Sequence, residues 1–228
     1  MLTCESLCKY YQSSKGMVKS LDEINLSVSK GEFLEVRGHS GSGKTTLLLT
    51  LGAMMHPTHG KVVFKGTDLY RLNRAERARV RSSSIGFVFQ MFHLIPYLDL
   101  VGNVLAGDDG NHSGAHSKSE ALLQELGLGH RLNHLPNQLS AGEKQRVALA
   151  RAMVASPDLI LADEPTGNLD PENSKEVCRH LKRYQEKGGT VIVVTHGDAV
   201  HDFANRTIDL KAGEIISGPS LDHQADEA

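Results

Sequence analysis

Residues 38–45 have the composition and the setting of a phosphate-binding loop. They read Gly-His-Ser-Gly-Ser-Gly-Lys-Thr and lie between the mostly apolar run 33–36 and a helix-forming stretch that starts at Thr45. The glycines let the backbone wrap closely round a polyphosphate, which then faces backbone N–H groups and a helix N-terminus. Lys44 supplies a cation and Thr45 a hydroxyl for Mg²⁺. We therefore predict a nucleotide site formed by Gly38, His39, Ser40, Gly41, Ser42, Gly43, Lys44, Thr45 and Thr46.

Two neighbouring carboxylates, Asp163 and Glu164, follow the apolar run 159–162. Because α/β sheets place their ligand crevice at the carboxyl ends of buried strands, Asp163 can reach Mg²⁺ and Glu164 can polarise a water molecule. An isolated pair of acids fits an ordinary strand-end turn equally well, but the phosphate-binding loop in the same chain favours a hydrolytic site.

His196 follows another apolar run, 190–194. We expect its imidazole at the same edge of the sheet, where it can contact the γ-phosphate and the attacking water. A histidine at a strand end is also common as a half-buried polar residue, so the position alone does not assign a role.

A second helix start offers groups for an anion. Residues 139–146 read Leu-Ser-Ala-Gly-Glu-Lys-Gln-Arg and precede a helical pattern. Ser140 would present a hydroxyl, and the backbone near Gly142 its N–H groups, at that helix N-terminus. The chain thus carries two helix starts suited to anions.

The order of apolar runs and helical patterns predicts an α/β fold with a mainly parallel sheet. The first thirty residues alternate apolar and polar, which is typical of an N-terminal layer of antiparallel strands, and a hairpin is expected at 207–216. Helical patterns replace the strands between Gln90 and about Ser156. We expect strands at 33–37, 61–65, 85–89, 158–162 and 190–195, and helices at about 99–106, 117–127 and 141–155.

These elements predict one domain over residues 1–216. Its α/β core covers about 1–90 and 157–216, and a helical subdomain is inserted at about 91–156. The polar segment 217–228 is expected to be a disordered tail.

The composition argues against several other functions. A net charge of −2 over 228 residues, without a basic tail, gives no support to a nucleic acid partner. Cys4, Cys8 and Cys178 have no CxxC spacing and no complete pairing, so a reduced, cytosolic location is expected. No apolar run approaches ~18 residues and the first residues lack the pattern of a signal peptide, so we expect neither a membrane span nor export. Any membrane association would then come through a partner.

The motifs together resemble, in type and order, those of the ATP-binding cassette (ABC) ATPases, because residues 139–146 are similar to that family's signature motif. The resemblance covers about residues 2–216 and implies a P-loop NTPase core, ATP and Mg²⁺ as cofactors, and ATP hydrolysis. For nucleotide binding, the resemblance implies that Tyr11 (rather than the adjacent Tyr10) stacks on the adenine, that residues Gly38 to Thr46 form the Walker A loop, and that Ser140, Ala141, Gly142 and Glu143 form the signature. For Mg²⁺ and water, it implies that Asp163 is the Walker B aspartate, which binds Mg²⁺ with Thr45, and that Gln90 is the Q-loop residue, which contacts Mg²⁺ and water. It further implies that Glu164 is the catalytic base, His196 the switch histidine and Asp170 the D-loop aspartate.

Residues 86–90 and 162–170 resemble one branch in particular, the ATPases of lipoprotein-releasing, macrolide-efflux and cell-division complexes. This resemblance implies a head-to-tail homodimer, in which the signature of one copy covers the ATP held by the Walker A loop of the other. It also implies a membrane permease that docks on the helical subdomain near Gln90 to Leu98, at the cytoplasmic face of the inner membrane, and to which the dimer transmits force. Internal packing is the alternative interpretation of the apolar residues in 91–98.

Three positions depart from the family pattern. Ala141 and Glu143 lie where Gly and Gln are usual, and Gly197 lies where Asp is common. A methyl group at position 141 would crowd the backbone near the γ-phosphate and weaken dimer closure.

Two other functions are compatible with a phosphate-binding loop. A soluble ABC ATPase of translation or DNA repair would use the same motifs, but this chain has one cassette and no sustained heptads. A P-loop kinase would need no signature segment. A metal site formed by Asp108, Asp109, His112 and His116 is not expected, because polar residues in a glycine-rich loop are usually solvated.

Overall fold

The computed structural model describes residues 1–14, 16–108, 110 and 114–217, so the expected tail at 218–228 lies outside the described residues. The strands are β1 (Leu2–Ser13), β2 (Gly16–Val28), β3 (Phe33–Arg37), β4 (His59–Phe64), β5 (Thr67–Asp68), β6 (Ile85–Val88), β7 (Leu159–Asp163), β8 (Thr190–Thr195), β9 (Arg206–Lys211) and β10 (Glu214–Ser217). The helices are α1 (Lys44–Leu51), α2 (Arg74–Ser84), α3 (Leu100–Leu105), α4 (Ala115–Glu125), α5 (Ala141–Met153) and α6 (Pro171–Glu186).

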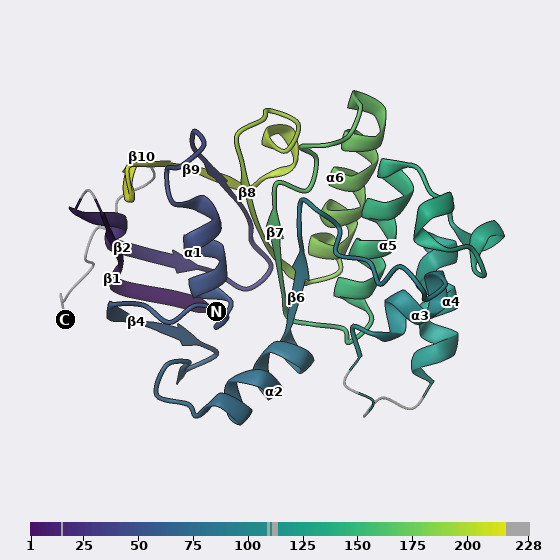
Figure 1. The fold of residues 1–228 in the computed structure, drawn as a ribbon, viewed down its shortest axis with the longest axis horizontal. Helices are drawn as coiled ribbons and strands as arrows, with labels where there is room; N and C mark the ends of the chain where they lie inside the picture. The colour runs from purple at the N-terminus through teal and green to yellow at the C-terminus, as the bar shows by residue number, and fades with distance from the viewer. Residues whose placement is uncertain (15, 109, 111–113, 218–228) are drawn as a thin grey trace, which may run out of the picture.

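The strands form two sheets (Figure 1). A four-stranded antiparallel sheet has the order β2-β1-β4-β5. A six-stranded sheet has the order β10-β9-β3-β8-β7-β6, and its neighbours are parallel except in the β10–β9 hairpin. The expected α/β fold with a mainly parallel sheet and an N-terminal antiparallel layer is confirmed.

The six-stranded sheet has a hydrophobic core on each face. Leu159 and Leu161 of β7 pack in the cluster that contains α1, whereas Ile160 and Ala162 pack in the cluster that contains α5 and α6. This division follows from the pleat of a strand, which points successive side chains to opposite faces. Figure 1 shows α1 and the antiparallel sheet on one side of β7, and α5 and α6 on the other. The helix starts at residues 44 and 141 therefore belong to opposite faces of the sheet.

Helices α3, α4 and α5, which lie between β6 and β7 in the sequence, pack against one another. Val104, Leu123 and Leu149 are fully buried in the cluster that they share with the sheet. Within the described residues, no helix combines the length and the apolar character needed to cross a membrane.

Two expectations need correction. The strand expected at 61–65 is β4, and it pairs antiparallel with β1 in the small sheet instead of joining the parallel sheet. An apolar run does not reveal its partner, and β4 follows the first helix as a parallel strand would. The helix expected at 117–127 is α4, which begins at Ala115 and ends at Glu125.

Candidate functional site

The parallel strands β3, β7 and β8 end at one edge of the sheet and place the predicted groups together there. Their register pairs Val36 with Val194 and Asp163 with the same Val194, so the three strands end in line. The phosphate-binding loop follows β3, Glu164 follows β7 and His196 follows β8. This is the edge at which α/β sheets bind ligands.

The loop between β3 and α1 depends on glycine at two positions. Gly41 and Gly43 have φ angles of 79° and 106°, which residues with a side chain rarely adopt. A Cβ atom on Gly43 would lie 2.2 Å from the carbonyl oxygen of Ser20, so β2 also excludes a larger residue. The loop therefore keeps its backbone N–H groups at the start of α1, where they can bind an anion.

Lys44 connects this loop with Glu164. Its Nζ atom donates to the carbonyl oxygens of Gly38 (2.7 Å) and His39 (3.1 Å) and lies 3.5 Å from Glu164 Oε1. Both side chains are more than nine-tenths buried. A buried cation and a buried carboxylate thus face each other beside the loop, where polyphosphate charge can be bound and a water molecule polarised.

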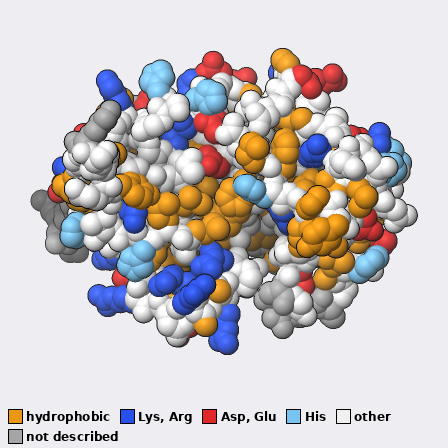
Figure 2. Space-filling model, viewed as in Figure 1, with side chains coloured by type: hydrophobic (Ala, Val, Ile, Leu, Met, Phe, Trp, Pro, Cys, Tyr) orange, Lys and Arg blue, Asp and Glu red, His pale blue; other side chains and the backbone are white. Residues whose placement is uncertain are grey.

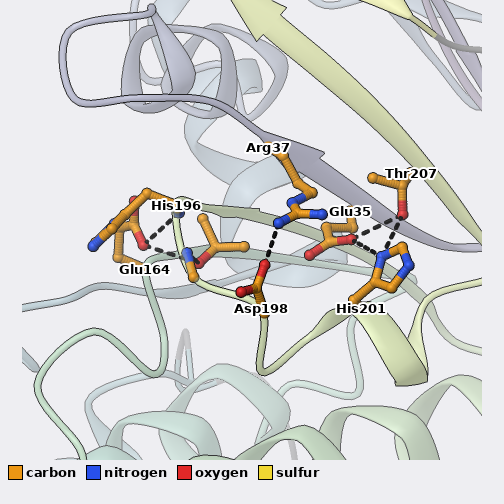
Figure 3. A network of polar contacts seen from close by, with 9 residues as sticks. Glu35, Arg37, Glu164, His196, Asp198, His201 and Thr207 are labelled. Atoms are coloured by element: carbon orange, nitrogen blue, oxygen red, sulfur yellow. Dashed lines mark hydrogen bonds and ion pairs between the residues drawn. The ribbon is translucent and has the colours of Figure 1, made fainter.

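Glu164 is held on both of its carboxylate oxygens (Figure 3). Oε2 accepts hydrogen bonds from Thr195 Oγ1 (3.0 Å) and from the backbone N–H of His196 (3.2 Å). Oε1 lies 2.8 Å from Nδ1 of His196, whose side chain is 59% exposed. Glu164 itself has a φ angle of 46°, a strained value for a residue with a side chain, which turns it away from the direction of β7. The carboxylate is therefore fixed in position, while the imidazole can still reach a ligand.

Asp163 and Thr45 offer oxygen ligands for a hard cation. Thr45 Oγ1 donates to Asp163 Oδ1 at 3.2 Å. Burial raises the pKa of Asp163, and the nearby charge of Glu164 raises it further, although the Thr45 hydrogen bond and Lys44 act in the opposite direction. Hydroxyl and carboxylate oxygens are the ligands that Mg²⁺ prefers, and a carboxylate whose charge is incompletely compensated fits a divalent cation.

One cavity opens at this edge of the sheet. Its lining residues come from β2, the loop, α1 and the ends of β6, β7 and β8, and they are Ser20, His39, Ser40, Gly41, Gly43, Lys44, Thr45, Thr46, Gln90, Glu164 and His196. The structure thus brings most of the predicted Walker A residues together with Gln90, Glu164 and His196, whereas Gly38, Ser42 and Asp163 do not line the cavity. Tyr11 does not line the cavity: the residue lies on β1 and is 39% exposed, and its hydroxyl donates to Met55 Sδ.

The signature residues lie apart from this cavity. Ser140 is the N-cap of α5, where its Oγ accepts from the N–H of Glu143 (3.3 Å) and its own N–H donates to Glu143 Oε2 (2.8 Å). Burial would raise the pKa of Glu143, but the hydrogen bonds from Ser140 and the charges of Arg131 and Arg146 lower it. The capping box leaves Ser140 and Ala141 exposed at the helix start.

Asp170 caps the helix next to the signature. It accepts from the N–H groups of Glu172 (3.1 Å) and Asn173 (3.0 Å) at the start of α6, and from Asn173 Nδ2 (2.6 Å). A Cβ atom on Gly142 would lie 2.2 Å from Asn173 Oδ1. The starts of α5 and α6 are therefore packed directly on each other, and the signature and Asp170 form one surface.

Two residues of the site were not expected from the sequence. Thr195 bonds to Glu164, and Ser20 Oγ donates to Thr46 Oγ1 at 2.8 Å. Thr195 could have been found, because it ends the strand beside Glu164 and immediately precedes His196. Ser20 gave no signal, since only the folded position of β2 brings it to the loop.

No group of His, Cys, Asp or Glu residues suited to a metal ion occurs in the described part of the chain. Of the residues considered around 107–117, Asp109 and His112 lie outside that part, and His116 lies 3.8 Å from Glu120 on α4.

Comparison with known proteins gives matches along almost the whole chain. Residues 21–167 match the family described as ABC transporter. The chain is 44% identical over 223 residues to the lipoprotein-releasing system ATP-binding protein LolD of Geobacter metallireducens, covering 95% of this chain and 98% of that protein. It is 40% identical over 218 residues to the macrolide export ATP-binding/permease protein MacB of Chlorobaculum tepidum, covering 95% of this chain but 34% of that protein.

Solved structures give the same result. The dimeric structure of MJ0796, a bacterial ABC transporter cassette, matches with a TM-score of 0.89 and 38% identity, and covers 97% of this chain and 99% of that chain. A dimeric post-hydrolysis state of MJ0796 bound to ADP and Pi matches with a TM-score of 0.88 and 37% identity, with the same coverage.

Proposed function

The chain belongs to the ABC transporter family, and from this we propose that it powers a lipoprotein-releasing or efflux-type complex as a head-to-tail dimer bound to a separate membrane permease. It is an ATP-binding subunit with ATPase activity. The main observation in support of this proposal is that Lys44, Glu164 and His196 line the same cavity at the edge of the sheet. A P-loop kinase for a small acceptor would leave the signature surface without a role.

In the proposed reaction, Lys44 and the loop N–H groups hold the β- and γ-phosphates of ATP. Glu164 orients the attacking water and accepts its proton, and the bonds from Thr195 and the His196 N–H aim its carboxylate. The exposed His196 imidazole, 2.8 Å from Glu164, bridges to the γ-phosphate. Thr45 and Asp163, with Gln90, would hold Mg²⁺, which neutralises phosphate charge when bound.

The dimer is proposed because each chain carries two half-sites on different surfaces. Ser140, Ala141, Gly142 and Glu143 are not among the residues that line the cavity of their own chain. They start a helix on the face of the sheet opposite α1. A second copy, turned head to tail, would bring its signature and its Asp170 to the ATP bound here. The dimeric MJ0796 structures support this arrangement. Tyr11, exposed on β1, is proposed to stack on the adenine.

The permease is proposed to dock on residues 90–98. Met91 and Tyr97 are 69% and 79% exposed, whereas Leu94 is half-buried against the core, so this segment displays part of its apolar surface and packs the rest. Gln90 joins it to the ATP cavity, and the neighbouring Asn168 donates to the Gln90 carbonyl oxygen at 3.2 Å. Loss of the γ-phosphate can thereby move the docking surface. We propose that this contact holds the dimer at the cytoplasmic face of the inner membrane.

The test is capture of the membrane partner in the ATP-bound state. Glu164→Gln protein with Mg-ATP is used to capture partners from detergent-solubilised membranes, and Glu164→Gln/Tyr97→Asp is the matched control. The proposal expects a permease with an extracytoplasmic domain, retained by the first variant and lost by the second. Retention of only ribosomal or DNA-repair proteins would contradict the transporter function.

A further inference from the structure

Helix α2 carries an uncompensated cluster of arginines on a chain whose net charge is −2. Arg74, Arg77, Arg79 and Arg81 lie within its eleven residues, and its one acid, Glu76, is used in the capping box with Asn73. Figure 2 shows the cluster as a continuous patch of Lys and Arg over the position of α2. α2 buries none of its residues, so the arginines are not explained by packing of the helix.

These four arginines have no ion-pair partner among the residues that the structure describes. Other basic side chains on the surface do form ion pairs, as in Lys61–Glu5 (2.8 Å) and Arg206–Glu32 (2.7 Å). Arg77 and Arg81 instead donate to the carbonyl oxygens of Leu72 and Ala53, which fixes their direction and leaves their charge without compensation. A set of oriented guanidinium groups without carboxylates is suited to bind an external anion.

Three of the arginines face one cavity. Arg74, Arg77 and Arg81 are spaced three and four residues apart, so they lie on one face of α2, and they line a cavity with Met54, His56 and Tyr70. The Tyr70 hydroxyl donates to the backbone, and the Arg77 guanidinium lies 5.8 Å from the Tyr70 ring centroid. Met54 is 51% exposed at this cavity. Guanidinium groups beside an exposed apolar side chain match the boundary between lipid headgroups and acyl chains.

The cavity lies next to the surface on which we propose that the permease docks, because Arg81 lines a cavity on each side. Arg81 also lines a neighbouring cavity, whose other lining residues include Phe89, His93 and Ile95. If residues 90–98 face the membrane permease, α2 faces the membrane surface beside it. This step rests on the proposed function.

We propose that Arg74, Arg77 and Arg81 form a site for the phosphate group of an anionic phospholipid, so that α2 contacts the membrane surface beside the permease. Arg79 adds long-range attraction to the same surface. Each arginine near an anionic bilayer contributes about 1 kcal/mol, or about five-fold in affinity. The site would orient the subunit and keep it at the membrane while the permease moves.

The test uses the purified chain alone, in a vesicle flotation assay without permease or ATP. Binding is compared between vesicles of phosphatidylglycerol with phosphatidylcholine and vesicles of phosphatidylcholine alone. We expect binding only to the first, weakened by rising NaCl, and reduced about 100-fold in Arg74→Gln/Arg77→Gln/Arg81→Gln. The matched control, Lys175→Gln/Arg179→Gln/Lys182→Gln on α6, loses the same charge and should bind like the original chain.

A second variant is needed because Arg77 and Arg81 donate to backbone carbonyl oxygens, so that the triple variant could lose binding through misfolding. Arg74→Gln/Arg79→Gln changes two exposed side chains and should still reduce binding about 20-fold, with an unchanged thermal unfolding curve.

Equal binding to neutral vesicles, or equal loss in the α6 control, would overturn the proposal. So would displacement by inorganic phosphate but not by NaCl of equal ionic strength, which would indicate a soluble phosphate ligand. If the arginine variants failed to capture the permease in lipid-free detergent, the arginines would be assigned to a protein contact instead. A failed permease capture with intact vesicle binding would contradict the proposed function alone.

Discussion

The Nδ1 atom of His196 lies 2.8 Å from the Oε1 atom of Glu164, although 32 positions separate the two residues in the chain. The contact arises because β7 and β8 are adjacent parallel strands that end in register. The same two residues line the cavity that contains Lys44. A carboxylate and an imidazole are thus held at the ends of two adjacent strands, and the buried cation that faces the carboxylate is held at the start of α1.

Replacing Glu164 with Gln should separate ATP binding from hydrolysis. The amide has the shape of the carboxylate but cannot accept a proton from water, so we expect turnover to fall by about 10²- to 10⁴-fold with little change in ATP affinity. Phosphate release and ATP binding are measured in parallel, and a dimer should accumulate with Mg-ATP. Lys44→Ala is the contrasting variant, which should lose nucleotide affinity. Normal turnover by Glu164→Gln would reject the assigned base.

Replacing Thr195 with Val tests whether the orientation of the Glu164 carboxylate affects the rate of hydrolysis. Valine keeps the shape of the buried side chain but removes the hydroxyl that donates to Glu164 Oε2 and accepts from the Gly197 N–H (3.0 Å). We expect kcat to fall by about 10-fold with unchanged ATP affinity, because a lost hydrogen bond to a charged group costs about 1.5–3 kcal/mol. Thr195→Ser should restore the activity.

Thr190 is a matched control at the other end of β8. It is equally buried, and its hydroxyl accepts from the Gly31 N–H at 3.0 Å. Thr190→Val should lower stability to a similar degree and leave kcat unchanged. Equal kcat values for the two valine variants would show that Thr195 has only a structural role.

The groups at the sheet edge could be predicted from the sequence because each follows a continuous apolar run. Parallel strands that are buried on both faces are recognisable from such runs, and their carboxyl ends meet. This is why the positions of Glu164 and His196 agree with the sequence analysis. The roles of individual residues are not given by position, and they remain predictions.

Other parts of the fold could not be predicted, for identifiable reasons. Helix α2 has no buried residue, so no apolar periodicity marks it, and the Asn73/Glu76 capping box was its one sequence signal. The contact of Ser20 with Thr46 depends on how two sheets pack, which no local pattern encodes. The pairing of β4 with β1 is non-local in the same way.

The charge of Asp163 should make the stability of the nucleotide-free chain depend on pH. Burial raises the pKa of Asp163, so the folded chain binds this proton more tightly than the unfolded chain does. The ionised carboxylate then costs stability, and the cost appears as the pH rises from the ordinary pKa to the raised one. Asp163→Asn removes it. We expect the variant to gain stability relative to the original chain as the pH rises above about 4, measured by urea unfolding.

Mg-ATP provides the control for this comparison. A bound cation would compensate the Asp163 charge, so Mg-ATP should stabilise the original chain more than Asp163→Asn at pH 7. Equal stabilisation of both proteins would remove Asp163 from the proposed Mg²⁺ ligands. A stability difference that is constant with pH would show that the Asp163 carboxyl does not titrate differently in the folded chain.

Replacing Gly142 with Ala should disturb the junction of α5 and α6. The new Cβ atom would lie 2.2 Å from Asn173 Oδ1, which also accepts from Arg146 Nη1, while Asn173 Nδ2 donates to Asp170. We expect about 1–3 kcal/mol lower stability from overpacking. In the double variant Gly142→Ala/Asn173→Ala the 2.2 Å contact with Oδ1 is removed and only the Cβ atom of residue 173 remains close, at 3.1 Å, so the two substitutions should be less destabilising together than their sum. Simple additivity would show that the clash is relieved elsewhere.

Replacing Ala141 with Gly tests whether the methyl group in the signature limits dimer closure. Ala141 is the first residue of α5 and is exposed, so its Cβ atom is not part of the packing of its own chain. Any large effect must then arise at the surface that meets the partner copy and its ATP. In the Glu164→Gln background, we expect the Mg-ATP dimer to form at several-fold lower protein concentration in Ala141→Gly, measured by sedimentation. The control Ala75→Gly, at an exposed position in the first turn of α2, should lower the stability of its helix by the same amount, at most about 1 kcal/mol, without changing dimerisation. An unchanged or weaker dimer in Ala141→Gly would mean that alanine is accommodated in the interface, and that this departure from the family pattern does not restrict the ATP cycle.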